Sequence, residues 1–205
     1  MRKLYGGLLY AATLAFFSFL LVQAKEAQLG SLAPDFTLQD TAGKPRSLSD
    51  FKGKYVVLEW TNPECPFVKK HYGSQNMQNL QKAWKQKDVA WLSICSFAEE
   101  KQGFFEPKDW QGILKERGSS PTAMLLDPDG RVGGMYAAKT TPHMFIVNPQ
   151  GVLIYKGAID DKRSVDPEDI KDAKNFVSLA LEEAMAGKPV KFSSTQSYGC
   201  SIKYK

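Results

Sequence analysis

The chain has 205 residues, of which 43% are hydrophobic and 24% charged, and its formal net charge is +5. This is the composition of an ordinary globular protein, and the length suits one domain with its own core. The sequence contains no cluster of lysine and arginine interleaved with aromatic residues, which argues against nucleic acid as a partner.

The first 24 residues have the three parts of a secretory signal peptide. Arg2 and Lys3 give a basic start, an uncharged apolar run follows, and VQA ends at Ala24. The run is short for a membrane span, which needs about 20 residues, so an uncleaved anchor is the alternative. Cleavage after Ala24 would remove two of the 27 basic residues and none of the 22 acidic ones, leaving a net charge of +3. We therefore expect a periplasmic or otherwise exported protein.

Hydrophobic periodicity and turn residues predict the elements in chain order. Residues 33–51 read as a β-hairpin around the turn DTAGK. Further strands are expected at residues 54–60, 89–97, 122–127, 143–148 and 152–157. Helices are expected after Ser74 as N-cap, at 106–118, and from Asp166 as N-cap through Val177 and Leu181 to Gly187.

Strands that alternate with helices, followed by a strand pair and a final helix, predict an α/β fold whose sheet is covered on both faces. No repeat or linker divides the chain. We assign residues 1–24 to the signal peptide, 25–190 to a single domain and 191–205 to a polar C-terminal tail that carries Cys200.

Cys65, within EWTNPECPFVKKHY, is the strongest candidate for a reactive residue. It follows a strand and a turn, and Pro66 suits the first position of a helix. The sulfur would then lie at a helix N-terminus, where free amide N–H groups and the dipole favour a thiolate. The run 69–71 (KKH) adds positive charge, whereas Glu64 opposes it. The turn and its charged neighbours indicate an accessible site; the alternative is a buried, unreactive cysteine.

Thr141-Pro142 stands immediately before the predicted strand at 143–148. Proline cannot donate to a strand ladder, so it belongs at the start of a strand. X-Pro bonds are the usual site of cis peptides, and a cis bond here would turn the Thr141 backbone toward a neighbouring loop. The alternative is an ordinary trans proline.

Two stretches carry a resemblance to a known family. APDFTLQDTAGK…LSDFKGKYVVLEW followed by CP resembles the opening of the redoxins, which include the alkyl hydroperoxide reductase/thiol-specific antioxidant proteins and the extracytoplasmic thioredoxins. TTPHMFIVNPQGVLIYKGAID resembles the cis-proline loop and last hairpin of the thioredoxin fold. The resemblance spans residues 29–187. It implies a thioredoxin-like fold, in which helices flank a central mixed sheet with an N-terminal β-hairpin extension. It also implies a nucleophilic Cys65 and a cis Pro142 packed against it.

The departures from this family matter as much as the likeness. Val68 occupies the second position of a C-x-x-C pattern, which excludes a local dithiol mechanism. A peroxiredoxin has a threonine three residues before its cysteine and a proline seven before, and here Asn62 and Leu58 stand there. Thr61 is displaced by one residue and is a candidate for the peroxide hydrogen bond. Arg131, after DPDG, is expected to be a solvated turn residue rather than the guanidinium that stabilises a thiolate.

Cys200 is the best candidate for a partner thiol. Its context, SYGCS, suggests a flexible tail that folds back, and closing a long loop costs little more than closing a moderate one. A sulfenic acid at Cys65 would condense with it, which would make Cys200 the resolving residue. The alternatives are a structural disulfide that pins the tail and an intermolecular bridge through Cys200. Cys95, in a predicted buried strand, is expected to be a core residue.

A metal site is a further interpretation. His71 follows Cys65 by six residues and points far round an ideal helix from it, whereas His143, after Pro142, would approach from the other side. The redoxin-like copper chaperones of respiratory oxidase assembly carry a C-x-x-x-C-P pair, and Thr61 replaces its first cysteine here. A copper site needs a soft ligand set, so we expect no resident metal, and we expect no cofactor.

The hypothesis is therefore an exported thiol oxidoreductase that acts by thiol–disulfide exchange or as a slow thiol peroxidase. Its expected catalytic residues are Cys65, Cys200, Pro142, Thr141 and Thr61. The expected partners are protein or small-molecule thiols and disulfides, with peroxide as a further candidate. A membrane is expected as a partner only through an uncleaved signal segment. The alternative from another class is a binding module without turnover, in which the groove between Cys65 and Pro142 holds an extended peptide and a Cys65–Cys200 disulfide is permanent. The sequence leaves the oligomeric state open.

Overall fold

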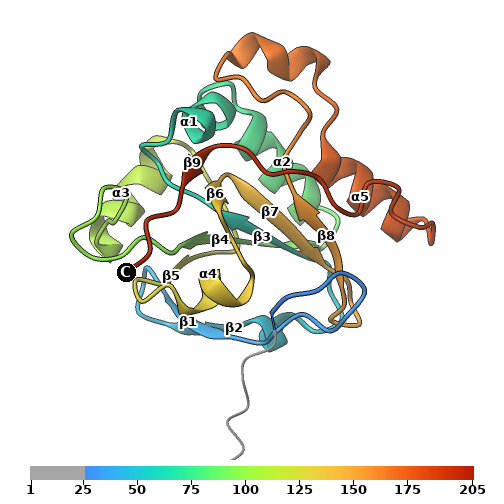
Figure 1. Ribbon diagram of the computed structural model, residues 1–205, viewed down its shortest axis with the longest axis horizontal. Helices are drawn as coiled ribbons and strands as arrows, with labels where there is room; N and C mark the ends of the chain where they lie inside the picture. The colour runs from blue at the N-terminus through green and yellow to red at the C-terminus, as the bar shows by residue number, and fades with distance from the viewer. Residues whose placement is uncertain (1–25) are drawn as a thin grey trace, which may run out of the picture.

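The computed structural model describes residues 26–205, so the predicted signal peptide lies outside the described residues (Figure 1). A seven-stranded sheet in the order β2-β1-β5-β4-β3-β7-β8 forms the centre. Its strands are β1 (Thr37–Asp40), β2 (Pro45–Ser47), β3 (Val56–Trp60), β4 (Ala90–Cys95), β5 (Ala123–Leu126), β7 (His143–Val147) and β8 (Leu153–Gly157). Strands β3, β4 and β5 pair in parallel and the other pairs are antiparallel, so the predicted central mixed sheet is confirmed.

Helices and short 3₁₀ turns connect these strands. They are η1 (Leu48–Phe51), α1 (Pro66–Gly73), α2 (Asn76–Lys85), α3 (Pro107–Glu116), α4 (Arg131–Met135), η2 (Pro167–Asp172) and α5 (Phe176–Met185). A second, two-stranded sheet joins β6 (Thr140–Thr141) to β9 (Cys200–Ser201) near the end of the chain. Within the described part of the chain, no helix is both long and apolar enough to cross a bilayer.

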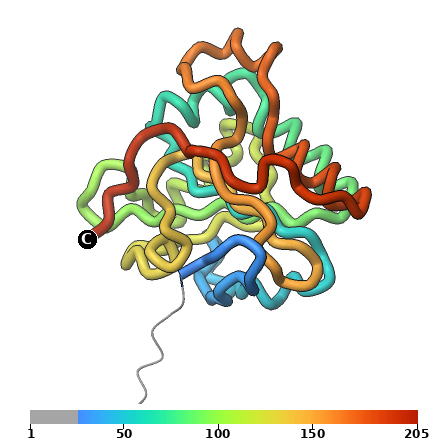
Figure 2. Tube along the Cα trace, turned by 45° about the vertical axis from the view of Figure 1, so that its right-hand side comes forward, coloured from blue at the N-terminus to red at the C-terminus, as the bar shows by residue number. Residues whose placement is uncertain are grey.

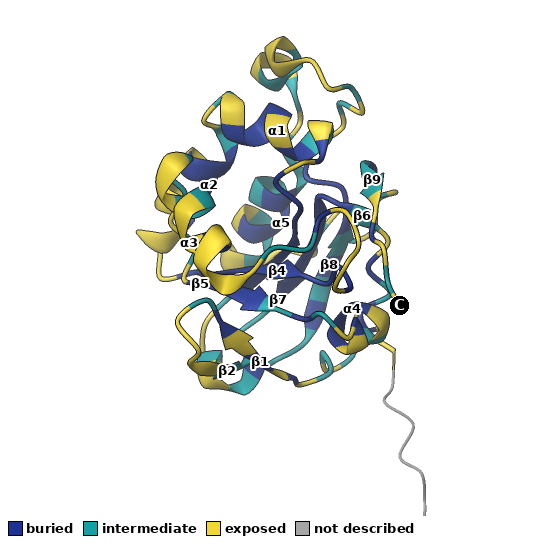
Figure 3. Ribbon diagram, turned by 90° about the vertical axis from the view of Figure 1, so that its left-hand side faces the viewer, coloured by how far each residue is buried: buried dark blue, intermediate teal, exposed yellow. Residues whose placement is uncertain are grey.

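Two hydrophobic cores lie on opposite faces of the sheet because successive side chains of a strand point to opposite faces. Along β3, Leu58 and Trp60 belong to one core and Val57 belongs to the other. The first core also receives side chains from α3 and α4, and the second receives side chains from α1, α2 and α5. Figure 3 shows the buried strands between helices whose outer faces are exposed. The expectation of a sheet covered on both faces is confirmed.

The N-terminal hairpin also forms as predicted. Asp40 stabilises its turn, because its carboxylate accepts hydrogen bonds from the backbone N–H groups of Ala42 and Lys44 and from Arg46. The hairpin extends the central sheet, since β1 pairs with β5.

Two predicted helices differ in detail from the structure: one begins after a different residue, and the other is divided in two. Ser74 donates its hydroxyl to the carbonyl of Lys70 at 2.8 Å, so it ends α1, and α2 begins after Gln75, whose φ is 62°. The final helix is two pieces. Asp166 caps η2 as expected, but Asn175 then caps a separate α5 and forms a bridge to Asp160 that interrupts the helical path.

The tail, residues 191–205, crosses the domain and packs on it (Figures 1 and 2). Its first part pairs with the edge strand β8, where the N–H of Thr195 donates to the carbonyl of Lys156 at 3.1 Å. Its second part forms β9 against β6, and the N–H of Ile202 donates to the carbonyl of Lys139. The segment predicted to be flexible is therefore held at both ends by backbone hydrogen bonds.

Candidate functional site

Cys65 lies where the sequence predicts, at the N-terminus of α1. It is the N-cap residue, and Pro66 occupies the first turn of the helix. The loop before it is a tight turn in which the N–H of Cys65 donates to the carbonyl of Asn62 at 3.1 Å. The Asn62 side chain accepts from the N–H of Glu64 at 2.9 Å, which fixes the entry to the helix.

The Thr141–Pro142 peptide bond is cis, as expected. The thiol of Cys65 donates a hydrogen bond to the carbonyl oxygen of Thr141 at a sulfur–oxygen distance of 3.0 Å. Residues 76 positions apart in the chain thus meet directly. The backbone around Pro142 is therefore a direct neighbour of the sulfur.

The tail brings Cys200 to the same place. Thr141 and Cys200 are partners in the β6–β9 pair, and all three cysteines are free thiols. The pKa of Cys200 is raised to about 12, first by burial and then by its interaction with the neighbouring Cys65 sulfur. Cys65, Thr141, Pro142 and Cys200 therefore form one cluster, although they come from three distant segments of the chain.

The expectation that Cys65 is accessible was wrong, since only 1% of its surface is exposed. The neighbouring Glu64 is exposed, but the sulfur points inward, toward Thr141 and Cys200. The tail lies so close that a Cβ on Gly199 would come within 2.0 Å of the Thr141 carbonyl oxygen. A reactant can reach the sulfur only after a covering segment has moved, and the tail segment that carries Cys200 is a direct neighbour of the sulfur.

The positive charge expected from the KKH run is also reduced. His71 is fully buried, and burial together with the charge of Lys70 lowers its pKa to about 3, so it is neutral at physiological pH. The Lys70 ammonium donates to the carbonyl of Lys162 at 2.8 Å. Of the three residues in this run, Lys69 alone is an exposed cation.

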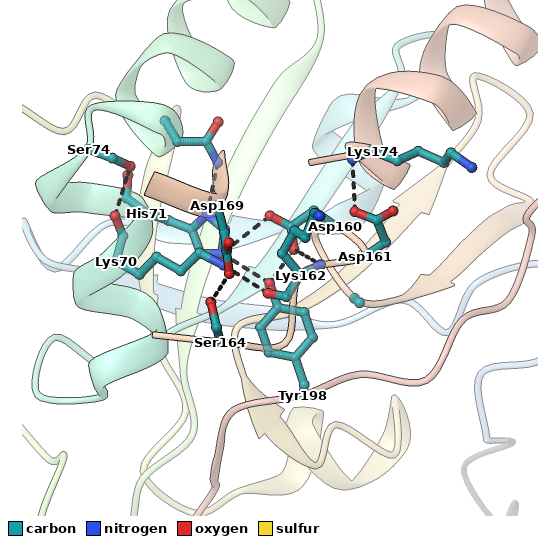
Figure 4. Close-up of polar contacts among 12 residues, drawn as sticks. Lys70, His71, Ser74, Asp160, Asp161, Lys162, Ser164, Asp169, Lys174 and Tyr198 are labelled. Carbon is teal, nitrogen blue, oxygen red and sulfur yellow. Dashed lines mark hydrogen bonds and ion pairs between the residues drawn. The ribbon is translucent and has the colours of Figure 1, made fainter. Parts of the chain in front are cut away.

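A polar cluster of His71, Asp160 and Tyr198 lies beneath the tail (Figure 4). The Tyr198 hydroxyl donates to Oδ1 of Asp160 at 2.5 Å and lies 3.3 Å from Nε2 of His71. All three side chains are buried. Sequence reasoning missed this cluster, because its members are separated by at least 38 residues and no local pattern relates them.

Glu59 is a second buried group that sequence reasoning missed. Its carboxyl accepts hydrogen bonds from Tyr72 at 3.0 Å, Trp91 at 2.8 Å and Ser93 at 2.9 Å, and burial raises its pKa. Thr61, predicted as a candidate for hydrogen bonding to peroxide, is buried, and it is a neighbour of this carboxyl that slightly offsets the rise in the pKa of Glu59. A glutamate inside an apolar strand was the available signal for this group, which ties α1 to β4.

Arg117, and not Arg131, reaches the loop that holds Cys65. Its guanidinium donates to the carbonyl of Pro63 at 2.6 Å and lies 5.1 Å from the centre of the Tyr72 ring. Arg131 is exposed at the start of α4, where it contacts the carbonyl of Thr37 at 3.4 Å. The expectation of a solvated turn residue at 131 is confirmed.

Cys95 and His143, which the sequence also singled out, make contacts of their own. Cys95 is a core residue, as expected: its thiol donates to the carbonyl of Gly103 at 3.5 Å, and burial raises its pKa to about 11. His143 accepts the N–H of Lys139 at Nδ1 and packs on Phe145. In residues 26–205, no three His, Cys, Asp or Glu side chains gather in a group able to hold a metal.

Comparison with known proteins agrees with this geometry. The profile of the AhpC/TSA family matches residues 29–156, more than half of the chain. The chain belongs to the AhpC/TSA family. Among curated relatives, thiol-disulfide oxidoreductase ResA of Bacillus subtilis is 32% identical over 125 residues, which are 61% of this chain and 64% of that protein. The match thus spans less than two thirds of that relative's length.

Solved structures show the same fold. An uncharacterized conserved protein from Geobacillus kaustophilus superposes with a TM-score of 0.73 at 29% identity, over 87% of this chain and 93% of that one. The thioredoxin domain of a thiol-disulfide oxidoreductase from Bacteroides vulgatus gives a TM-score of 0.52 at 25% identity, over 72% and 97% of the two chains. The fold is thioredoxin-like, as the resemblance implied.

Proposed function

We propose that this protein is an exported thiol–disulfide oxidoreductase in which Cys65 is the nucleophile and Cys200 the resolving thiol. The observation that carries the proposal is the meeting of the two thiols beside the Thr141–Pro142 peptide. Relatives whose names describe thiol–disulfide oxidoreductases support it. Export rests on the signal-peptide pattern of residues 1–24.

The exchange proceeds in two steps. The Cys65 thiolate attacks one sulfur of a substrate disulfide, forms a mixed disulfide and releases the other substrate sulfur as a thiolate, which takes up a proton. Cys200, as its thiolate, then attacks the Cys65 sulfur, forms the Cys65–Cys200 disulfide and releases the second substrate thiol. Two electrons pass from the protein to the substrate, and an external dithiol must return them before the next turnover.

Particular features of the site support each step. Cys65 lies at the N-terminus of α1, and its hydrogen bond to the Thr141 carbonyl fixes the sulfur in place. Burial, and after it the neighbouring Cys65, raises the pKa of Cys200 to about 12, so Cys200 holds its proton in the resting state and passes it to the leaving substrate sulfur during resolution. An extended substrate segment would pair with the backbone at Thr141 once the tail vacates it.

A slow thiol peroxidase is the second candidate, favoured by the match to the AhpC/TSA family. Cys65 would take one oxygen from a hydroperoxide to give a sulfenic acid and an alcohol. The sulfenic acid would then condense with Cys200 to give the disulfide and water. Asn62 and Leu58 stand where a peroxiredoxin has its threonine and proline, and this departure makes disulfide exchange the preferred reaction.

The test compares the wild type with Cys65→Ser, Cys200→Ser and the control Cys95→Ala in a disulfide-reduction assay and in hydrogen peroxide consumption. We expect Cys65→Ser to abolish exchange, Cys200→Ser to stall as a mixed disulfide, and Cys95→Ala to keep the wild-type rate. Full activity in Cys65→Ser would overturn the proposal. A Cys65–Cys200 bond that dithiothreitol does not reduce at neutral pH would instead favour the binding module.

A further inference from the structure

The tail reaches the sulfur pair through an anchored span. Backbone hydrogen bonds hold Thr195 against β8, and Cys200 against β6. Tyr198 lies between these two anchors, and its side chain is buried. Its ring packs edge-on against Phe67 of α1, with the ring centres 5.7 Å apart. Because Tyr198 precedes Cys200 by two residues, its position limits where the Cys200 thiol can lie.

The hydrogen bonds of the polar cluster have defined directions. The side-chain N–H of Asn76 donates to Nδ1 of His71 at 2.8 Å, so Nδ1 accepts and the proton of the neutral ring is on Nε2. That N–H donates to the Tyr198 oxygen, and the Tyr198 hydroxyl donates to Asp160. The tail is thus joined to α1 and to the loop after β8 through one phenol, and Figure 4 shows the three groups converging.

One oxygen of the Asp160 carboxylate is free to form a new hydrogen bond if the tail moves away. Oδ2 of Asp160 is buried and has no hydrogen-bond partner among the described residues, and it lies 4.0 Å from Nε2 of His71. When Tyr198 leaves, a small side-chain movement lets the His71 N–H donate directly to this carboxylate. Asp160 also accepts the backbone N–H of Lys162 at 3.0 Å, a bond that does not involve the tail. The body of the protein can therefore keep these polar groups paired without the tail, which lowers the cost of release.

Closing of the tail has two consequences for the chemistry. It places the Cys200 thiol on Cys65, and it leaves 1% of the Cys65 surface exposed. A substrate disulfide must approach along the same side, so attack on substrate requires the open tail and resolution requires the closed tail. A group that stabilises the closed tail therefore slows attack on substrate and favours resolution by Cys200.

We propose that His71, Asp160 and Tyr198 are positioning residues that form a releasable clamp on the C-terminal tail, which shields Cys65 when closed and seats Cys200 against it. The proposal rests on the proposed function for the role of Cys200. Loss of the Tyr198 hydroxyl removes a hydrogen bond to a carboxylate, for which we expect an effect of about tenfold to hundredfold on the closed–open equilibrium.

The test compares Tyr198→Phe with the matched control Tyr136→Phe in the otherwise unchanged chain. Tyr136 is also buried and its hydroxyl donates to a backbone carbonyl, that of Pro34, at 2.7 Å, but it lies outside the cluster. Each protein is equilibrated with reduced and oxidised glutathione, in which oxidised glutathione takes two electrons and leaves as two thiols. Peptide mapping then gives the effective concentration of the Cys65–Cys200 pair. The rate of Cys65 alkylation by iodoacetamide is measured separately on the reduced protein.

We expect Tyr198→Phe to lower the effective concentration and to raise the alkylation rate, each by about tenfold or more. Tyr136→Phe should leave both within about twofold, and Asp160→Asn, which keeps an oxygen to accept from Tyr198, should fall between. The clamp is overturned if Tyr198→Phe matches the wild type, or if the control changes equally. Should Tyr198→Phe not fold, Asp160→Asn decides by the same two readouts.

The two proposals fail separately. Alkylation of Cys65 requires no activity, so it tests closing of the tail even if Cys65→Ser and Cys200→Ser exchange disulfides at the wild-type rate. In that case the proposed function fails, and the clamp would only cover Cys65 without a role in resolution.

Discussion

Cys65 and Cys95 are both buried, with 1% and 4% of their surfaces exposed; Cys65 follows β3 after a short turn, and Cys95 is the last residue of the neighbouring parallel strand β4. Their surroundings differ in kind. Cys95 is covered by the core and its thiol bonds to the Gly103 carbonyl. Cys65 lies at a helix N-terminus beneath a tail that carries a second thiol. Burial alone therefore does not distinguish the proposed nucleophile from the core cysteine, whereas the segments that surround each sulfur do.

In the proposed clamp, lifting a few residues of the tail exposes Cys65, whereas Cys95 lies within the hydrophobic core. Local openings cost less than global unfolding where few apolar contacts must break. Substitutions in the tail, in the loop before Cys65 and at Cys95 should change the access to each cysteine, or its chemistry, by different amounts.

The largest effect is expected from crowding the tail at Gly199. Gly199→Ala should prevent the tail from seating, because its Cβ would lie 2.0 Å from the Thr141 carbonyl oxygen and its φ is 131°. We expect the alkylation rate of Cys65 to rise about tenfold to hundredfold and that of Cys95 to stay unchanged. Gly187→Ala is the matched control, since Gly187 also has a positive φ, of 68°, but open space around it. Equal acceleration in the control would show that general loosening, and not the tail, limits access.

A smaller effect is expected from loosening the loop that presents Cys65. Arg117→Met removes the hydrogen bond to the Pro63 carbonyl but keeps much of the apolar stem, and should slow disulfide exchange about tenfold. Arg131→Met is the control and should leave the rate unchanged, because Arg131 is exposed and distant from this loop. Rates measured against one disulfide substrate test both, and equal rates in the two variants would contradict the role assigned to Arg117.

Lowering the pH should reduce the free energy of unfolding through His143, the residue after Pro142. Burial, with the charges of Lys156 and Lys139, lowers its pKa to about 4 from 6.5, so below pH 6.5 the unfolded chain takes up a proton that the native state refuses. Stability from this group is fully present above pH 6.5 and is lost as the pH falls toward 4. Relative to His143→Gln, the wild type should lose about 1.4 kcal/mol of unfolding free energy between pH 7.5 and 5.5. Urea titrations at the two pH values measure this difference, and a constant difference would contradict the neutral, buried state of His143.

The smallest effect is expected at Cys95. Cys95→Ala should lower the unfolding free energy by about 1 kcal/mol, through lost packing, and leave disulfide exchange at the wild-type rate. Denaturant titration and the exchange assay measure the two quantities. A loss of exchange in this variant would mean that the third thiol takes part in the chemistry.

The sequence predicted the parts of this site that depend on local patterns. The strand, turn and Pro66 located Cys65 at a helix start, and the position of Thr141-Pro142 before a strand indicated the cis bond. The burial of Cys65 was not predictable in this way, because it depends on a tail whose path is set by pairing with β6 and β8.

The same limit explains the missed residues. The sequence predicted that His71 adds positive charge near Cys65. The residue is neutral because it is buried, and its neighbours Asp160 and Tyr198 are distant in sequence. The sequence placed Arg117 near the end of a predicted helix. Its contact with Pro63 joins two segments that come together only in the folded protein. Patterns along the chain predict elements, whereas contacts between elements decide protonation and access.

The central claim is that Cys65 and Cys200 form one redox pair and that Cys95 stands apart from it. Non-reducing peptide mapping of the protein after equilibration with oxidised glutathione tests this directly. The account predicts a Cys65–Cys200 disulfide within one chain and a free thiol at Cys95. A Cys65 that carries only glutathione, or a disulfide that includes Cys95, would contradict it.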